Sequence, residues 1–107
     1  MGYLRRHAIV VTGSDYMDAK EIKQAHEKAS EIFPWVSPIS PPMMNGEMSF
    51  FIPPDGSKEG WADSNEGDAR RDLFIDWLKE SYCADCWVEV SYGEDKPDTK
   101  VTRASDL

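Results

Sequence analysis

The alternation of apolar and polar positions along the chain predicts helices and strands in turn. Residues 7–12 (HAIVVT) form an uninterrupted apolar and β-branched run. A strand with no polar alternation is covered on both faces or both edges, so this segment is expected inside a sheet. From residue 18 to residue 33 the apolar period becomes helical, and Pro34 ends the pattern. This segment is expected to be a half-buried helix packed on the sheet.

The next two predicted elements form a hairpin. Residues 35–44 (WVSPISPPMM) contain three prolines, and Asn45-Gly46 follows them. Asn-Gly is a strong signal for a two-residue hairpin turn. Proline is tolerated mainly in edge strands, so residues 35–44 are predicted as an edge strand paired with the apolar strand of residues 48–52.

The second half of the chain repeats the alternation. Asp63 is expected to cap a second helix, with Glu66 returning the capping-box bond. Its apolar stripe is Ala69, Leu73, Phe74, Trp77 and Leu78. Residues 86–92 (CWVEVSY) alternate, which predicts a strand with one covered face. The polar residues 93–107 are expected to be an edge extension or a loose tail.

The resulting order is βαββαβ, that of a ferredoxin-like α+β sandwich, with a four-stranded antiparallel sheet and two helices on one face. Right-handed crossovers would place the first and third strands in the middle. One domain is expected over residues 1–107, with its core between about residues 7 and 93. The predicted core residues are Ile9, Val11, Phe50, Ile52, Phe74, Trp77 and Val88.

The net charge and the length of the apolar runs argue against several classes of function. The 107 residues carry twenty acids and twelve bases, a net charge of −8, with a pI near 4.6. A nucleic-acid or anionic-membrane binder needs a basic surface, so neither partner is expected. No apolar run approaches the roughly 20 residues of a membrane span, and the N-terminus lacks an apolar signal core. A cytoplasmic protein is predicted.

Two surfaces are candidate binding sites. The sheet face opposite the helices is predicted to expose Phe51 and Trp87, with Val10 between them and Glu89 beside them. A partly apolar sheet face with an acidic rim favours a protein contact, including a homodimer. Alternatively, the loop at residues 55–61 and the helix behind it could hold an anion, even though the loop lacks the spacing of a phosphate-binding loop. The residues of this alternative are Ser57, Lys58, Trp61, Arg70 and Arg71.

Catalytic and metal chemistry have little support. Cys83 and Cys86 form a CxxC pair, but His7 and His26 alone remain to complete a zinc site and have no paired spacing. The pair closes a helix, whereas a redox motif is expected to open one. Structural cysteines are therefore predicted, with no metal and no cofactor. No nucleophile with a fixed partner is recognisable, so the chain is not expected to be an enzyme. The Asp55 to Trp61 loop is expected to be a structured turn, with Trp61 anchoring it to the core.

Four stretches resemble a family of small tailed-bacteriophage proteins without an assigned activity: HAIVVTG, SFFIPPDGSKEGW, GDARRDLFIDWL and WVEVSYGED. The likeness covers about residues 7–95. It implies expression in a bacterial host cytoplasm and transfers no catalytic residue. The leading hypothesis is a small acidic protein that binds a host or phage protein stoichiometrically. The alternatives are a small-molecule or nucleotide sponge that uses the loop, and an enzyme of unrecognised type.

Overall fold

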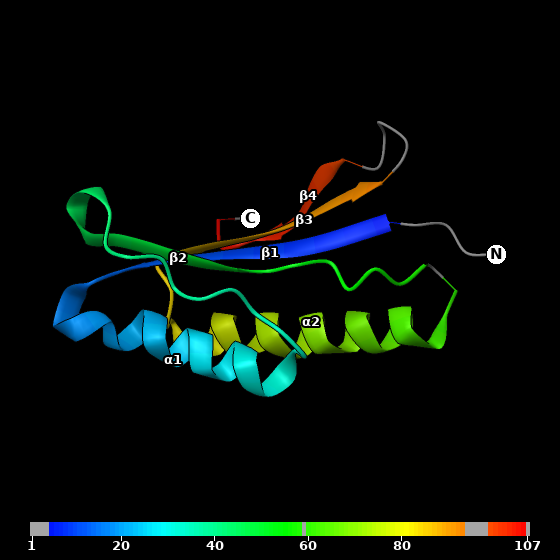
Figure 1. The fold of residues 1–107 in the computed structure, drawn as a ribbon, viewed down its shortest axis with the longest axis horizontal. Helices are drawn as coiled ribbons and strands as arrows, with labels where there is room; N and C mark the ends of the chain where they lie inside the picture. Colours follow the sequence, from blue (N-terminus) through cyan, green and yellow to red (C-terminus); the bar gives the residue numbers. More distant parts are fainter. Residues whose placement is uncertain (1–4, 59, 94–98, 107) are drawn as a thin grey trace.

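A computed structural model describes residues 5–58, 60–93 and 99–106, and over these residues the chain has an α+β fold. One four-stranded antiparallel sheet is covered on one side by two helices (Figure 1). In chain order the elements are β1 (Arg5–Ser14), α1 (Tyr16–Ile32), the short 3-10 turn η1 (Met44–Gly46), β2 (Glu47–Ile52), α2 (Ala62–Ser81), β3 (Cys86–Gly93) and β4 (Lys100–Ala104).

The strand order in the sheet is β2-β1-β3-β4. The first predicted strand is confirmed as an interior strand, because β1 pairs with both β2 and β3. The apolar strand of residues 48–52 was expected in the interior, but β2 is an edge strand of the four. The second interior place belongs to β3, because the C-terminal residues 100–104 add β4 beside it. The loose-tail alternative is therefore wrong for these residues, and residues 94–98 and 107 of that tail lie outside the described chain.

The predicted edge strand at residues 35–44 is not a strand, although it does lie beside β2. Ser37 and Ser40 donate their backbone N–H groups to the carbonyls of Phe51 and Ser49, at 2.9 and 2.8 Å. In return, the hydroxyls of the two serines accept the backbone N–H groups of Phe51 and Ser49. Three prolines remove N–H groups from this segment, so serine hydroxyls supply part of the pairing that a regular ladder would give.

The hairpin turn itself forms at the predicted residues. Asn45 and Gly46 both have positive φ, 59° and 72°, and the Glu47 N–H bonds the Met44 carbonyl. Positive φ at both central residues is what an Asn-Gly turn supplies at low steric cost.

The first helix forms nearly where its period predicts. α1 buries Ala19, Ile22, Ala25 and Ala29 against the sheet, and the Phe33 N–H bonds the Ala29 carbonyl at its end. Its first turn departs from regular helix, since Met17, Asp18 and Ala19 have positive φ.

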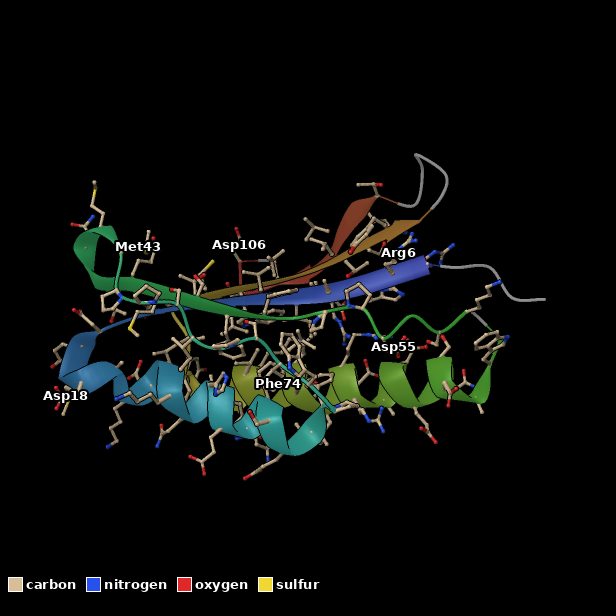
Figure 2. The ribbon with its side chains drawn as sticks, viewed as in Figure 1. Arg6, Asp18, Met43, Asp55, Phe74 and Asp106 are labelled. Carbon is tan, nitrogen blue, oxygen red and sulfur yellow. The ribbon has the colours of Figure 1, made fainter. Side chains whose placement is uncertain are left out.

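The second helix differs in its start and its buried face. Trp61 occupies the N-cap position, without a side-chain cap, so the capping box predicted from Asp63 is wrong. The buried stripe is Gly67, Arg71, Phe74, Ile75 and Leu78, whereas Leu73 is 57% exposed. Phe74 lies in the layer between the helices and the sheet (Figure 2). The buried stripe is rotated relative to the prediction because Arg71 is buried beside Asp68 and Glu89. The polarity of an arginine in the sequence predicts exposure and does not reveal such partners.

Most of the predicted core is confirmed. Ile9, Val11, Phe50, Ile52 and Phe74 are buried in one cluster with residues of both helices, and Trp77 packs against it half-buried.

Val88 is the exception, because the residues of β3 that were predicted to face the helices lie on the opposite side of the sheet. Trp87 and Glu89 face the helices and are only 5% and 3% exposed, while Val88 lies on the opposite side of the strand.

Candidate functional site

The side of the sheet away from the helices carries an apolar row that crosses all four strands. Val10 of β1 is the cross-strand partner of Phe51 on β2 and of Val88 on β3, and Val88 is the partner of Ala104 on β4. Directly opposed residues share a face. Val10 is 38% and Phe51 42% exposed, so this side, which we call the open face, presents apolar area to its surroundings.

Polar groups lie at the two ends of the open face. At one end Thr12 and Ser49 share a hydrogen bond of 2.9 Å between their hydroxyls. At the other end the Arg6 guanidinium lies 5.8 Å from the centre of the Tyr92 ring. On the described strands, Glu47 at the start of β2 supplies the one carboxylate of this side. Asp106, which follows β4, also lies on this side of the sheet (Figure 2). The described strands of the open face are therefore poor in acid, although the chain as a whole is strongly acidic.

The predicted contact residues separate onto two sides of the sheet. Phe51 and Val10 lie on the open face as expected, but Trp87 and Glu89 point to the helices. Alternate residues of β3 point to opposite sides of the sheet, but the alternation does not show which of the two sets faces the helices. Trp87 buries more apolar area than a valine, and the Glu89 charge has partners inside, so this set is the buried one.

The Glu89 carboxylate is held by groups from β4 and α2. Arg103 donates from Nε to Oε1 and from Nη2 to Oε2, both at 2.8 Å, and the Thr102 hydroxyl donates to Oε1 at 2.7 Å. Arg71 Nε lies 3.8 Å from Oε2, and Arg103 also donates from Nη1 to Asp72 at 2.9 Å.

Burial raises the pKa of Glu89, but the hydrogen bonds and charges of Arg103, Thr102 and Arg71 outweigh it and leave this pKa below its usual value. The same carboxylate raises the pKa of Arg103. The role of this network is to tie β3, β4 and α2 together. Sequence reasoning missed Thr102 and Arg103; the available signal was a glutamate inside an apolar strand, which needs a cationic partner.

A cavity of about 200 Å³ lies on the helix side of the sheet, where β1 and the end of β2 approach α2. Its walls are mostly apolar: Ile9, Ile52, Phe33 and the segments 34–35 and 53–54. Its polar lining consists of His7, Asp55, Arg70 and Arg71.

The residues of the predicted loop site are only partly brought together. Ser57, Trp61 and Arg70 border a separate shallow hollow that also includes Asp55, Asp63 and Glu66. Arg71 lines the cavity instead, and Lys58 lines neither of them. Glu59 lies outside the described residues. Trp61 is 46% exposed and does not anchor the loop in the core as expected.

Within that loop, Asp55 Oδ1 accepts the Ser57 N–H at 2.8 Å and the Ser57 hydroxyl at 2.6 Å. Burial raises the pKa of Asp55, yet these bonds and the charges of Arg71 and Arg70 leave it below its usual value. Asp55 is therefore a fixed negative charge between the hollow and the cavity.

The cysteines and histidines are dispersed. Cys83 is buried with Sγ 3.3 Å from Gln24 Oε1, and Cys86 is exposed. His26 Nε2 lies 2.9 Å from the Ser37 carbonyl, and its ring meets Phe50 edge to face. Within residues 5–58, 60–93 and 99–106 no group of three or more His, Cys, Asp or Glu side chains could hold a metal ion.

No family model matches the chain, and no curated protein or solved structure shows significant similarity to it. In the described part of the chain, neither helix is long and apolar enough to cross a bilayer.

Proposed function

We infer that this chain is a stoichiometric binding protein of ferredoxin-like architecture that associates through its open face and does not act as an enzyme. The strand order β2-β1-β3 supports this architecture, because a βαββαβ domain would have the strands at residues 47–52, 5–14 and 86–93 as neighbours in that order. The segment at residues 35–44 then stands in for the missing edge strand, and β4 is an addition at the other edge.

The observation that carries this proposal is the apolar row of Phe51, Val10, Val88 and Ala104. Burying such area stabilises association by roughly 25 cal/mol per Å². It needs no special chemistry, which agrees with the lack of a recognisable nucleophile. Trp35 extends the row, because its ring packs edge to face on Phe51 at 6.5 Å between centroids.

A second copy of the chain is the occupant that fits best. Two chains of charge −8 repel each other over most of their surfaces. On its described strands the open face has one carboxylate, that of Glu47 at the margin, and Asp106 lies beyond β4, so two copies can meet there with less repulsion than elsewhere. Two antiparallel sheets packed face to face leave about 10 Å between them, which apolar side chains of this size fill.

The resemblance to bacteriophage proteins extends the proposal to a host or phage protein as the eventual target, in the cytoplasm of an infected bacterium. The loop at residues 55–61 is the weaker site for a nucleotide. Its hollow presents Asp55, Asp63 and Glu66 beside a single guanidinium, and these carboxylates would repel phosphates.

Sedimentation equilibrium of the wild type and of Val10→Asp tests the proposal. The wild type is expected to be a dimer and Val10→Asp a folded monomer. Leu73→Asp, which adds the same charge at an exposed position of α2, is the matched control and should remain dimeric. A wild type that stays monomeric at millimolar concentration, or equal dissociation in both variants, would refute the open face as the contact.

A further inference from the structure

The cavity between the sheet and α2 has the size of a small ligand. At about 200 Å³ it is somewhat larger than a cavity of about 150 Å³ that holds benzene. It lies on the helix side of the sheet, as Ile9 and Ile52 in its wall belong to the buried core. The cavity shares Trp35 with the proposed contact surface, but Ile9 and Ile52 in its wall face the helices, so the inference does not rest on the proposed function.

Gly67 shapes the polar end of this cavity. A Cβ at this position would lie 2.5 Å from Asp55 Oδ2 and 3.2 Å from Arg71 Nη1. The glycine therefore lets an acidic loop residue and a buried arginine converge over the second turn of α2. Figure 2 shows Asp55 on the segment that passes between the end of β2 and this helix. Glycine inside a helix costs about 1 kcal/mol relative to alanine, so its presence needs a local reason.

The cavity lining holds more cationic than anionic groups, because Asp63 and Glu66 line the adjacent hollow and not the cavity. Two guanidiniums, of Arg70 and Arg71, stand against the one carboxylate of Asp55. Arg71 is already engaged by Asp68 and Glu89. Arg70 has a looser contact, 3.8 Å from Glu66, and its side chain is partly exposed. Arg70 is thus the cation best placed to turn toward a ligand, while Asp55 is held back by its two bonds from Ser57.

We propose that this cavity binds a small flat apolar molecule carrying one carboxylate. The apolar part lies against Ile9, Ile52 and Phe33, and the carboxylate accepts charge-assisted hydrogen bonds from Arg70 at the mouth. The mainly apolar wall with a few polar groups at one end is the usual composition of a small-molecule site.

Benzoate, benzamide and benzamidine test the proposal because they share one shape and differ in charge. Each is titrated into the ¹⁵N-labelled full chain while amide shifts are followed by NMR. Benzoate should shift the amides of Ile52 and Gly67 in a saturable way and bind more tightly than benzamide. Equal binding of benzoate and benzamide, preferential binding of benzamidine, or shifts spread evenly over the chain would overturn the proposal.

Single substitutions test whether Arg70 binds the carboxylate of the ligand. Arg70→Gln should weaken benzoate roughly tenfold, the value of one charge-assisted hydrogen bond. Arg6→Gln, which removes an arginine from the open face, is the control and should bind as the wild type does. Gly67→Ala should remain folded, because alanine favours helix, but should weaken benzoate binding, because its methyl group fills part of the polar end of the cavity that Gly67 lines. Unchanged affinity in both Arg70→Gln and Gly67→Ala would show that the cavity is not the site.

Discussion

Arg103 donates two parallel hydrogen bonds to Glu89, each 2.8 Å long, from the neighbouring strand of the sheet. Such paired bonds fix both side chains in one plane and are stronger than single neutral ones. Glu89 is 3% exposed, so its charge has almost no access to water and depends on this pairing. These bonds hold the polar residues 100–104 beside β3, where they form the edge strand β4.

Glu89→Ala is expected to destabilise the fold by about 3 kcal/mol, because it removes the paired acceptor of Arg103 and one of the two carboxylates that engage the buried Arg71. Glu21→Ala, at an exposed position of α1, is the control and should change stability by less than about 0.5 kcal/mol. Urea denaturation followed by circular dichroism measures both. Similar midpoints for the two variants would show that the network contributes nothing.

The same carboxylate predicts a pH dependence. Since the pKa of Glu89 is lowered on folding from its ordinary 4.5, its ionised form stabilises the native state. This contribution is fully present above about pH 4.5 and is lost as the pH falls through the lower folded pKa. Unfolding free energies measured from pH 7 to pH 2 should fall less steeply below pH 4.5 for Glu89→Gln than for the wild type. Parallel curves would contradict the pairing.

Phe50 and Phe51 are neighbours on β2 that face opposite sides of the sheet. Phe50→Ala should cost about 3 to 5 kcal/mol, because it leaves a cavity in the core beside His26. Phe51→Ala removes the same atoms from the open face and should cost less than about 1 kcal/mol in the monomer. Chemical denaturation at low protein concentration compares the two variants. A denaturation midpoint unchanged by Phe50→Ala would contradict the burial of Phe50.

Trp87 distinguishes the two faces of β3. Trp87→Asp would place a carboxylate in the core and should unfold the chain, whereas Val10→Asp should leave its circular dichroism spectrum native. A folded Trp87→Asp variant would mean that Trp87 lies on the open face after all.

The cysteines are predicted to be structural. The double variant Cys83→Ser and Cys86→Ser should stay folded, and elemental analysis of the wild type should find no stoichiometric zinc or iron. In the folded wild type an alkylating reagent should label the exposed Cys86 before the buried Cys83, as followed by mass spectrometry. About one metal ion per chain, lost in the double variant, would make the CxxC pair a site.

Local patterns determined much of this protein. The apolar run at residues 8–11, the helical period ending at Pro34 and the Asn45-Gly46 turn each act through residues close in sequence, and each forms near its predicted place. Five of the seven predicted core residues are buried, because the apolar positions that mark the inward side of β1, β2 and α2 are visible in the sequence pattern.

Tertiary structure decided what depends on distant partners. Alternation along β3 defined two possible faces, but only Arg103 and Arg71 made it favourable to bury Glu89 beside Trp87. The bonds from Arg103 to Glu89 also hold residues 100–104 beside β3 as the strand β4. The burial of Arg71 gives α2 a different inward side from the one that its apolar residues predict. The cavity beside Gly67 likewise exists only because residues 55, 67 and 71, from a loop and a helix, meet in space. A buried charge is costly alone and tolerated when it is paired. The apolar period of the sequence therefore determined where the helices and strands form, whereas the pairing of Glu89 with Arg103 and Arg71 determined which sides of β3 and α2 face inward.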